Sequence, residues 1–500
     1  MSNLQPAPPE TEGTSLGRAR LGVFGIVFFV VAAAAPLVGM TGAVPVAIVL
    51  GNGAAVPGTY LLVGIILLLF SVGYATMSHY VTNTGAFFAF IGRGLGVAVG
   101  VGSAFVSLVA YLAIQLAIFG FFGVVMAGEM AARFGLEAEW WIWVLIAWAL
   151  VFVLSWFSVD IGAKLLGILL ILELLSLAIV GLAVLFSGGG PEGMQLGDSF
   201  LPSAIFAGAP GIAFAFAFAS FIGFEATAIY GEEAKNPKRT VPRATYLAIL
   251  VITILFAVVS WAMVSGIGSS VIIEETVGIT GELADPAALL WAVTDQYVGS
   301  WLTEIMKVLV LTSLFAGLLA FQNSAGRYFF SMGRAGVLPK ALDRVNKYRA
   351  PSAGSIATTV ITGIVIVWFA IQGLDPFANL FSWFSALAVV AIVLVEMLVC
   401  VAIIAYFRKT KEDTRPWNTM IAPILALIGL VAGEYLLIAK FALLAGTAAD
   451  GSDPTVDSFA LNTTGWILVL LPFAILILGA VWGKARVSKE NEDLIKDLVS

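Results

Sequence analysis

Residues 211–243 read GIAFAFAFASFIGFEATAIYGEEAKNPKRTVPR, and this stretch decides the fold. It opens with a strongly apolar run, followed by the glycine–acid sequence Gly223-Phe224-Glu225. A carboxylate inside a membrane-length apolar segment costs about 2.5–3.5 kcal/mol on insertion scales, and such residues usually have a function. A glycine beside it allows the helix to break, and many carriers hold their substrate at helices broken near the membrane midplane. The alternative is a kinked helix in which Glu225 turns inward or caps a neighbouring helix.

The composition restricts the class of protein. Of 500 residues, 60% are hydrophobic and 11% are charged, which is typical of an integral membrane protein. A single cysteine, Cys400, excludes an intramolecular disulfide framework, and a single histidine, His79, argues against histidine-based metal sites and catalytic triads. We expect no enzymatic activity, no cofactor, no metal ion and no nucleic acid partner. Residues 1–15 lack the order of a cleavable signal, so we expect the first span to direct insertion.

The hydropathy pattern predicts an all-α integral membrane protein with twelve transmembrane helices. The first, third and eighth segments are longer than a bilayer requires, which predicts tilt, breaks or extension beyond the lipid. The twelve apolar segments cover residues 21–50, 57–80, 85–127, 139–158, 160–187, 205–231, 242–268, 287–330, 354–373, 377–407, 417–446 and 463–483.

The charges predict the orientation in the bilayer. Basic residues cluster before span 1 and after spans 2, 6, 8, 10 and 12, whereas the alternate loops are acidic. Of the 25 lysine and arginine residues, only Arg133, Lys307 and Lys440 fall on or near the acidic side. The positive-inside rule therefore predicts a multi-pass protein of the cell membrane with both termini in the cytoplasm.

Two spans carry signs of a break. Span 1 has Pro36 in its middle, and proline removes a backbone donor and moves residue 35 away from helical angles. Span 6 has its own weak point at Ser220–Gly223, five spans later. Two interrupted helices at corresponding positions of two halves indicate a binding site near the midplane. Taken alone, Pro36 favours an ordinary kink, because proline is common in membrane helices. Paired with the weak point of span 6, it favours a break.

Few other charges lie inside the predicted spans. Glu173 in span 5 has no basic residue within helical reach, so it must be protonated, partnered across helices or hydrated. It is a candidate for proton coupling, and the alternative is a packing hydrogen bond. Three further interpretations are structural. Glu304 and Lys307 form an i,i+3 pair, Glu434 and Lys440 are interfacial, and His79 is an interfacial polar residue.

Three motifs resemble the amino acid–polyamine–organocation superfamily, in particular its bacterial amino acid permeases. The most specific is FIGFEATAIYGEEAKNPKRTVPRA (221–244), which is similar to the family signature of span 6. NTGAFFAFIGRGLG (83–96) and SAGRYFFSMGRAGVLPKAL (324–342) support it. The resemblance covers about residues 20–485.

The resemblance implies a leucine-transporter-like fold. Its parts are a cytoplasmic tail (1–20), two five-helix inverted repeats (21–187 and 205–408), two additional helices (417–483) and a second cytoplasmic tail (484–500). Family members bind the carboxylate and amine of the substrate at the unwound parts of spans 1 and 6. Half-helix amino ends attract a carboxylate, and free carbonyls attract an ammonium group. The corresponding residues here are Ala34, Ala35, Pro36, Leu37, Val38, Ser220, Phe221, Ile222, Gly223 and Phe224.

The chain departs from its relatives at three positions. Many relatives carry a G-S-G or G-T-G triplet in span 1, where this chain has Pro36-Leu37-Val38, so the carboxylate cradle must differ. Some proton-coupled relatives have a lysine in span 5, where Glu173 aligns, so their lysine mechanism does not transfer. Ala219 stands where antiporters of the family have a tryptophan, which weakens an antiport assignment.

The interpretation is a secondary carrier that imports an amino acid or a related amine by proton symport. Glu173 and Glu225 are the candidate proton-coupling residues, and sodium is left open as the coupling ion. The alternative is an amino acid or amine exchanger or a polyamine carrier. A membrane enzyme would need a catalytic cluster of histidine, cysteine or aspartate, and a channel would show repeated filter loops. Neither pattern is present in the sequence.

Overall fold

In the computed structural model, residues 21–81, 86–157, 160–229 and 234–486 are described. The predicted tail 1–20, most of the tail 484–500, and Glu232-Glu233 of the span 6 motif lie outside these ranges. Within them the regular structure is helical, and the β contacts are two isolated bridges, Leu21–Ala234 and Ala448–Leu461.

The helices of the first half are α1 (Val23–Ala34), α2 (Pro36–Val38), η1 (Gly39–Ala43), α3 (Val44–Val46), η2 (Ala47–Asn52), η3 (Gly53–Ala55), α4 (Val56–Met77), α5 (Ala86–Leu95), α6 (Val97–Phe134), α7 (Trp140–Ser155), α8 (Asp160–Ser187), α9 (Leu196–Phe200) and α10 (Pro202–Ile205). Those of the second half are α11 (Pro210–Phe221), α12 (Ala226–Ile229), α13 (Pro237–Ile267), α14 (Ile272–Thr280), α15 (Ala288–Tyr297), α16 (Ser300–Arg334), η5 (Lys340–Asp343), α17 (Ser352–Gln372), η6 (Pro376–Phe381), α18 (Ser382–Thr410), η7 (Trp417–Ile421), α19 (Ala422–Ala439), α20 (Phe441–Ala445) and α21 (Thr463–Arg486).

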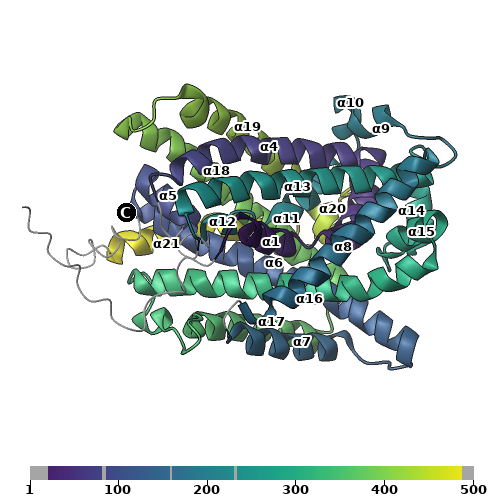
Figure 1. Cartoon of the computed structure of the whole chain (residues 1–500), viewed down its shortest axis with the longest axis horizontal. Helices are drawn as coiled ribbons and strands as arrows, with labels where there is room; N and C mark the ends of the chain where they lie inside the picture. Colours follow the sequence, from purple (N-terminus) through teal and green to yellow (C-terminus); the bar gives the residue numbers. More distant parts are fainter. Residues whose placement is uncertain (1–20, 82–85, 158–159, 230–233, 487–500) are drawn as a thin grey trace, which may run out of the picture.

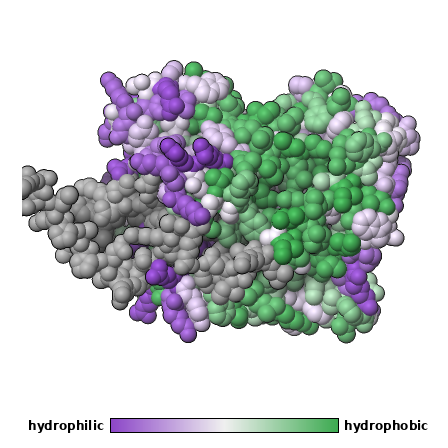
Figure 2. Space-filling model, in the orientation of Figure 1, coloured by the Kyte–Doolittle hydropathy of each residue, from purple (hydrophilic) through white to green (hydrophobic). Residues whose placement is uncertain are grey.

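The helices account for the twelve predicted spans. Nine helical stretches of the described chain are long and apolar enough to cross a membrane, and the first of them, Val23–Met77, contains spans 1 and 2. The shorter apolar helices α7 and α11 supply spans 4 and 6. Apolar residues cover the middle of the molecule in Figure 2, and polar residues gather at its two ends. This distribution is that of a helical bundle embedded in a bilayer.

All three overlong segments contain a break. The first is interrupted at Ala35, between α1 and α2. The third divides at Gly96 into α5 and α6, and the eighth divides around Gly299 into α15 and α16. Each division gives the chain a change of direction within an apolar run, which hydropathy alone does not locate.

The two interrupted helices occupy the interior of the bundle. In Figure 1, α1, α11 and α12 lie in the middle, with α4, α13 and α18 on one side and α16 on the other. The helix α1 contacts α13 and α16, and α11 contacts α4, α18 and α19. The neighbours thus hold both broken helices away from lipid.

Candidate functional site

The first break falls where Pro36 predicts it. Ala35 adopts left-handed backbone angles (φ 42°, ψ 67°), and its N–H donates to the carbonyls of Val31 and Ala32 at the end of α1. Pro36 then starts α2 at the first helical position, where its missing N–H does no harm. Ala34, Ala35, Pro36, Leu37 and Val38 are all buried. The break therefore directs the amino end of a half-helix into the protein interior.

Glu173 of α8 caps this half-helix. Its Oε1 accepts the backbone N–H of Leu37 at 2.6 Å, and its side chain is 3% exposed. The hydroxyl of Ser313 on α16 lies close to the same carboxyl but has no hydrogen-bond partner of its own. An anionic group is stabilised at the amino end of a helix by the helix dipole and the free N–H groups. A side chain of the protein thus occupies the position expected for a substrate carboxylate.

The second break lies against the first. The helix α11 ends at Phe221, Ile222 is extended (φ −56°, ψ 127°), and Gly223 has φ 111°. A Cβ at Gly223 would lie 2.8 Å from Cβ of Ala33. Glycine is required at this position both by the backbone angle and by the close approach of α1.

Glu225 holds the second break in shape. Its Oε2 accepts the backbone N–H of Gly223 at 2.9 Å, and its Oε1 accepts the hydroxyl of Tyr111 on α6 at 2.6 Å. The hydroxyl of Tyr74 on α4 donates to the backbone carbonyl of Glu225 at 3.0 Å. The Glu225 side chain is fully buried. Both carboxyls singled out in the sequence therefore lie at helix breaks, each accepting a backbone N–H.

Ser220 and Phe224, two residues of span 6 that the sequence predicts at the substrate site, contact different neighbouring helices. The hydroxyl of Ser220 bonds to Phe216 within α11 and lies 3.2 Å from the hydroxyl of Tyr60 on α4. Phe224 packs against Phe70 and Phe87, with ring centroids 5.7 and 6.4 Å away. Its ring therefore packs towards α4 and α5.

The sequence interpretation missed the groups that come from distant helices. Tyr111 and Tyr74 lie 114 and 151 positions before Glu225, and no spacing rule connects them to it. Gln322 on α16 accepts a hydrogen bond from Gln115 on α6 at 2.9 Å and donates one to Thr359 on α17 at 2.8 Å. It therefore joins three helices.

One prediction about the remaining charges is confirmed. Glu304 and Lys307 form an ion pair at 3.1 Å, with the Glu304 side chain 53% exposed, as expected. Glu434 differs from Glu304, because it is buried among the helices, with 6% of its surface exposed. Lys440 instead donates to the backbone carbonyls of residues 455–457.

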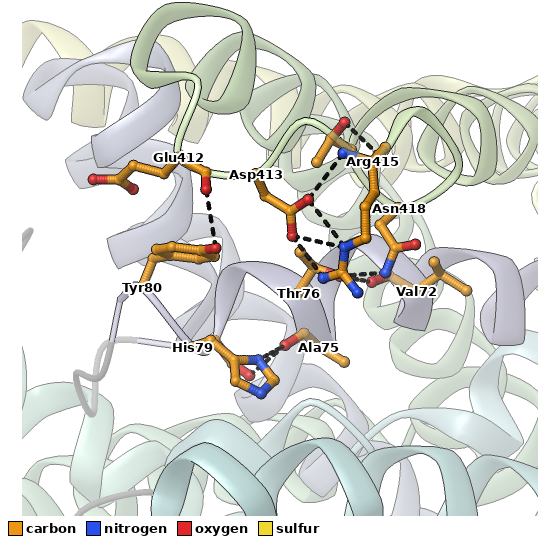
Figure 3. Close-up of polar contacts among 11 residues, drawn as sticks. Val72, Ala75, Thr76, His79, Tyr80, Glu412, Asp413, Arg415 and Asn418 are labelled. Carbon is orange, nitrogen blue, oxygen red and sulfur yellow. Dashed lines mark hydrogen bonds and ion pairs between the residues drawn. The ribbon is translucent and has the colours of Figure 1, made fainter.

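His79 is confirmed as an exposed polar residue at the end of α4, and its Nδ1 lies 2.8 Å from the carbonyl oxygen of Ala75 (Figure 3). Beside it, a polar network links α4 to the segment before α19. Asn418 donates to the hydroxyl of Thr76 at 3.0 Å, and Arg415 pairs with Asp413 at 2.6 Å. This network lies at the end of α4, two residues beyond Tyr74.

Comparison with known proteins agrees with this architecture. The family model described as amino acid permease matches residues 25–492. The chain is 28% identical over 221 residues to the branched-chain amino acid permease BcaP of Lactococcus lactis subsp. cremoris, covering 44% of this chain and 43% of that protein. It is 25% identical over 312 residues to the histidine permease of Saccharomyces cerevisiae, covering 59% of this chain and 50% of that protein. It is also 25% identical over 243 residues to the putrescine transporter PotE of Escherichia coli, covering 48% of this chain and 51% of that protein.

The chain spans about half the length of the curated relatives that it matches. The family model, by contrast, covers nearly all of it, including both helix breaks, Glu173 and Glu225. With its bundle of apolar helices and its two interrupted helices in the interior, the chain belongs to the amino acid permease family.

Proposed function

We propose that this protein imports an amino acid across the cell membrane by proton symport. The substrate would bind at the two helix breaks, Ala34–Val38 and Ser220–Phe224. Glu173 and Glu225 would bind the coupled protons. The five-helix repeats 21–187 and 205–408 would move relative to each other, with helices 417–483 outside the repeats and both termini in the cytoplasm. No covalent chemistry is involved.

The observation that carries this proposal is the hydrogen bond from Leu37 N–H to Glu173. The amino end of α2 is the natural position for a substrate carboxylate, and Glu173 occupies it. Two carboxylates at one buried helix end repel each other strongly, because the surroundings screen charge poorly. Protonation of Glu173 removes this repulsion and weakens the hydrogen bond that its carboxyl accepts from the N–H of Leu37. Proton binding and substrate binding then favour each other, which is the thermodynamic requirement for symport.

Glu225 supports the same logic at the second break. Its carboxylate accepts hydrogen bonds from Gly223 and Tyr111, so its charge state affects both the backbone of the break and the position of α6. A substrate ammonium group would be attracted to Glu225 whenever that carboxyl is ionised, since opposite charges attract in the interior, so Glu173 would carry the coupled proton once the amine has bound. Glu173 and Glu225 thus suit the two ends of an amino acid.

The test is uptake into proteoliposomes with a panel of amino acids and putrescine, under an inward proton gradient, an inward sodium gradient, or neither. The proposal expects accumulation of one or more amino acids with the proton gradient and none with sodium alone. Accumulation driven by sodium would contradict proton coupling.

The alternative is an exchanger or a polyamine carrier, which the similarity to the putrescine transporter PotE favours. Two buried carboxyls at the helix breaks would also suit a diamine. In the same experiment this alternative predicts putrescine transport, or exchange that needs internal substrate and is independent of any gradient.

A further inference from the structure

We infer that Glu396 on α18 and Glu434 on α19 form a second proton-binding site, separate from the two helix breaks and linked electrostatically to Glu225. The site goes beyond the proposed function, which uses neither residue. Participation of its protons in transport rests on the proposed symport, whereas the presence of the protons does not.

Both side chains are buried without hydrogen-bond partners. Glu396 is 3% exposed and Glu434 is 6% exposed. Both carboxyl oxygens of Glu434 and Oε2 of Glu396 have no hydrogen-bond partner. Glu173 and Glu225, in contrast, each accept a backbone N–H. An ionised carboxylate is not stable in an apolar interior without partners and takes up a proton instead.

The pair lies behind the interrupted helix α11. The helix α18 contacts both α11 and α19. Next to Glu434, a Cβ at Gly433 would lie 2.6 Å from the ring of Phe218, so α19 is pressed directly against α11. Glu396 lies within electrostatic range of both Glu434 and Glu225. The three carboxyls therefore lie on α19, on α18 and just beyond the end of α11, three helices that contact one another.

The groups near these three carboxyls include a thiol and two phenolic hydroxyls. Cys400, one turn along α18, interacts with Glu396. Glu225 accepts hydrogen bonds from the hydroxyls of Tyr111, to its carboxylate, and Tyr74, to its backbone carbonyl. The ion pairs of the described residues involve none of these carboxyls, and Lys440 is bound by backbone carbonyls. A buried carboxyl without hydrogen-bond partners or a paired cation is stable in its neutral form, so the ligand that fits is a proton.

Linkage to Glu225 follows from the like charges. If Glu225 is ionised, a second negative charge on Glu396 is disfavoured, and Glu396 keeps its proton. If Glu225 is protonated, ionisation of Glu396 becomes easier. Groups that interact in this way titrate together, so the pH at which one loses its proton depends on the other.

The test is infrared spectroscopy of the purified protein in lipid bilayers, following the carbonyl stretch of protonated carboxyls as the pH changes. We expect Glu396→Gln and Glu434→Gln each to remove one component that is present at neutral pH. Glu396→Gln should also shift the pH midpoint of the component that Glu225→Gln removes. Glu304→Gln is the matched control, since Glu304 is exposed and ion-paired, and it should remove none of these components.

Deuterium exchange of the wild-type protein provides a measurement that needs no variant. Protonated carboxyls shift their band in heavy water, so the absence of such a band at neutral pH would overturn the inference, as would unchanged spectra in both glutamine variants. Since the experiment uses neither substrate nor gradient, its failure would leave the symport proposal intact. If the glutamine variants lose their bands while transport by the wild-type protein does not depend on a proton gradient, the proton-binding site is established and symport is refuted.

Discussion

The backbone N–H of Leu37 donates to the carboxyl of Glu173 at 2.6 Å, although 136 positions separate the two residues in sequence. The bond joins the middle of α8 to the amino end of α2. It couples the charge of one side chain to the geometry of the first helix break, because the cap is lost or weakened when the carboxyl takes up a proton. Helix α8 also contacts α13 and α16, so a change in the position of Glu173 can shift the packing of these two helices.

Replacing Glu173 with glutamine should separate substrate binding from proton coupling. The amide keeps the size of the side chain and an oxygen that can accept the Leu37 N–H, but it cannot exchange a proton. We expect binding and exchange of substrate to be retained, and the acceleration of net uptake by an inward proton gradient to be lost. Proteoliposome uptake at several pH values measures both properties. If the variant accumulates substrate with the pH dependence of the wild type, Glu173 is structural and Glu225 becomes the better candidate for coupling.

Replacing Gly223 with valine should weaken substrate binding. The residue has φ 111°, and a side chain would collide with Ala33 of α1. Backbone strain of this kind costs about 1–3 kcal/mol, which corresponds to a loss of affinity of about 5- to 150-fold. Equilibrium binding to the purified protein measures the effect. Gly336→Val is the matched control, because Gly336 also has positive φ (72°) but open space around it. Equal affinity in both variants would remove the second break from the binding site.

Replacing Tyr111 with phenylalanine should change the pH profile of uptake. The variant keeps the ring, whose centroid lies 5.2 Å from that of Tyr328, but removes the hydroxyl that donates to Glu225 at 2.6 Å. A hydrogen bond to a charged group contributes about 1.5–3 kcal/mol. Tyr297→Phe is the control, because it removes a hydroxyl that donates to the backbone carbonyl of Gly266 at 2.8 Å and not to Glu225. A Tyr111→Phe profile identical to that of the control would show that Glu225 does not titrate during transport.

Neutralising Lys235, Lys238, Arg239 and Arg243 together should affect insertion more than binding. All four side chains are exposed around the start of α13. Basic loops set the orientation of neighbouring spans, so we expect less inserted protein or a mixed topology, measured by surface level and by labelling of engineered cysteines. The protein that does insert should bind substrate normally. Neutralising Arg133, Lys307 and Lys440 serves as the control and should leave the topology unchanged. Normal insertion with abolished binding would place the loop in the substrate site.

Replacing Asp413 with asparagine should destabilise the end of the bundle shown in Figure 3 in a pH-dependent manner. The hydrogen bond from Arg415 lowers the pKa of Asp413 below its usual value. A lowered pKa in the folded state contributes stability that is present above the unfolded pKa of about 3.9 and is lost as the pH falls through the folded value. Arg415 is 67% exposed, so the contribution is about 1 kcal/mol or less. Thermal unfolding should show that the variant is less stable than the wild type at pH 7, and this difference in stability should disappear in strong acid. If the variant remains less stable in acid, the loss of stability comes from packing and not from the ion pair.

The sequence by itself determined the properties that depend on local chemistry. Runs of apolar residues establish the twelve spans, because a bilayer requires a minimum length of apolar helix. Pro36 and Gly223 establish where two of these spans break, since proline lacks an N–H and glycine alone tolerates the backbone angle. The motif from Phe221 to Ala244 identified the family.

Only the tertiary structure decided which side chains meet. The bonds of Glu173 to Leu37 and of Tyr111 to Glu225 join residues more than 100 positions apart. Glu434 shows why sequence patterns could not supply them. Its helix is apolar on all sides, so no amphipathic face indicates which way a side chain points. In a membrane helix, burial against protein and exposure to lipid select the same residue types, and only packing of the neighbouring helices distinguishes them.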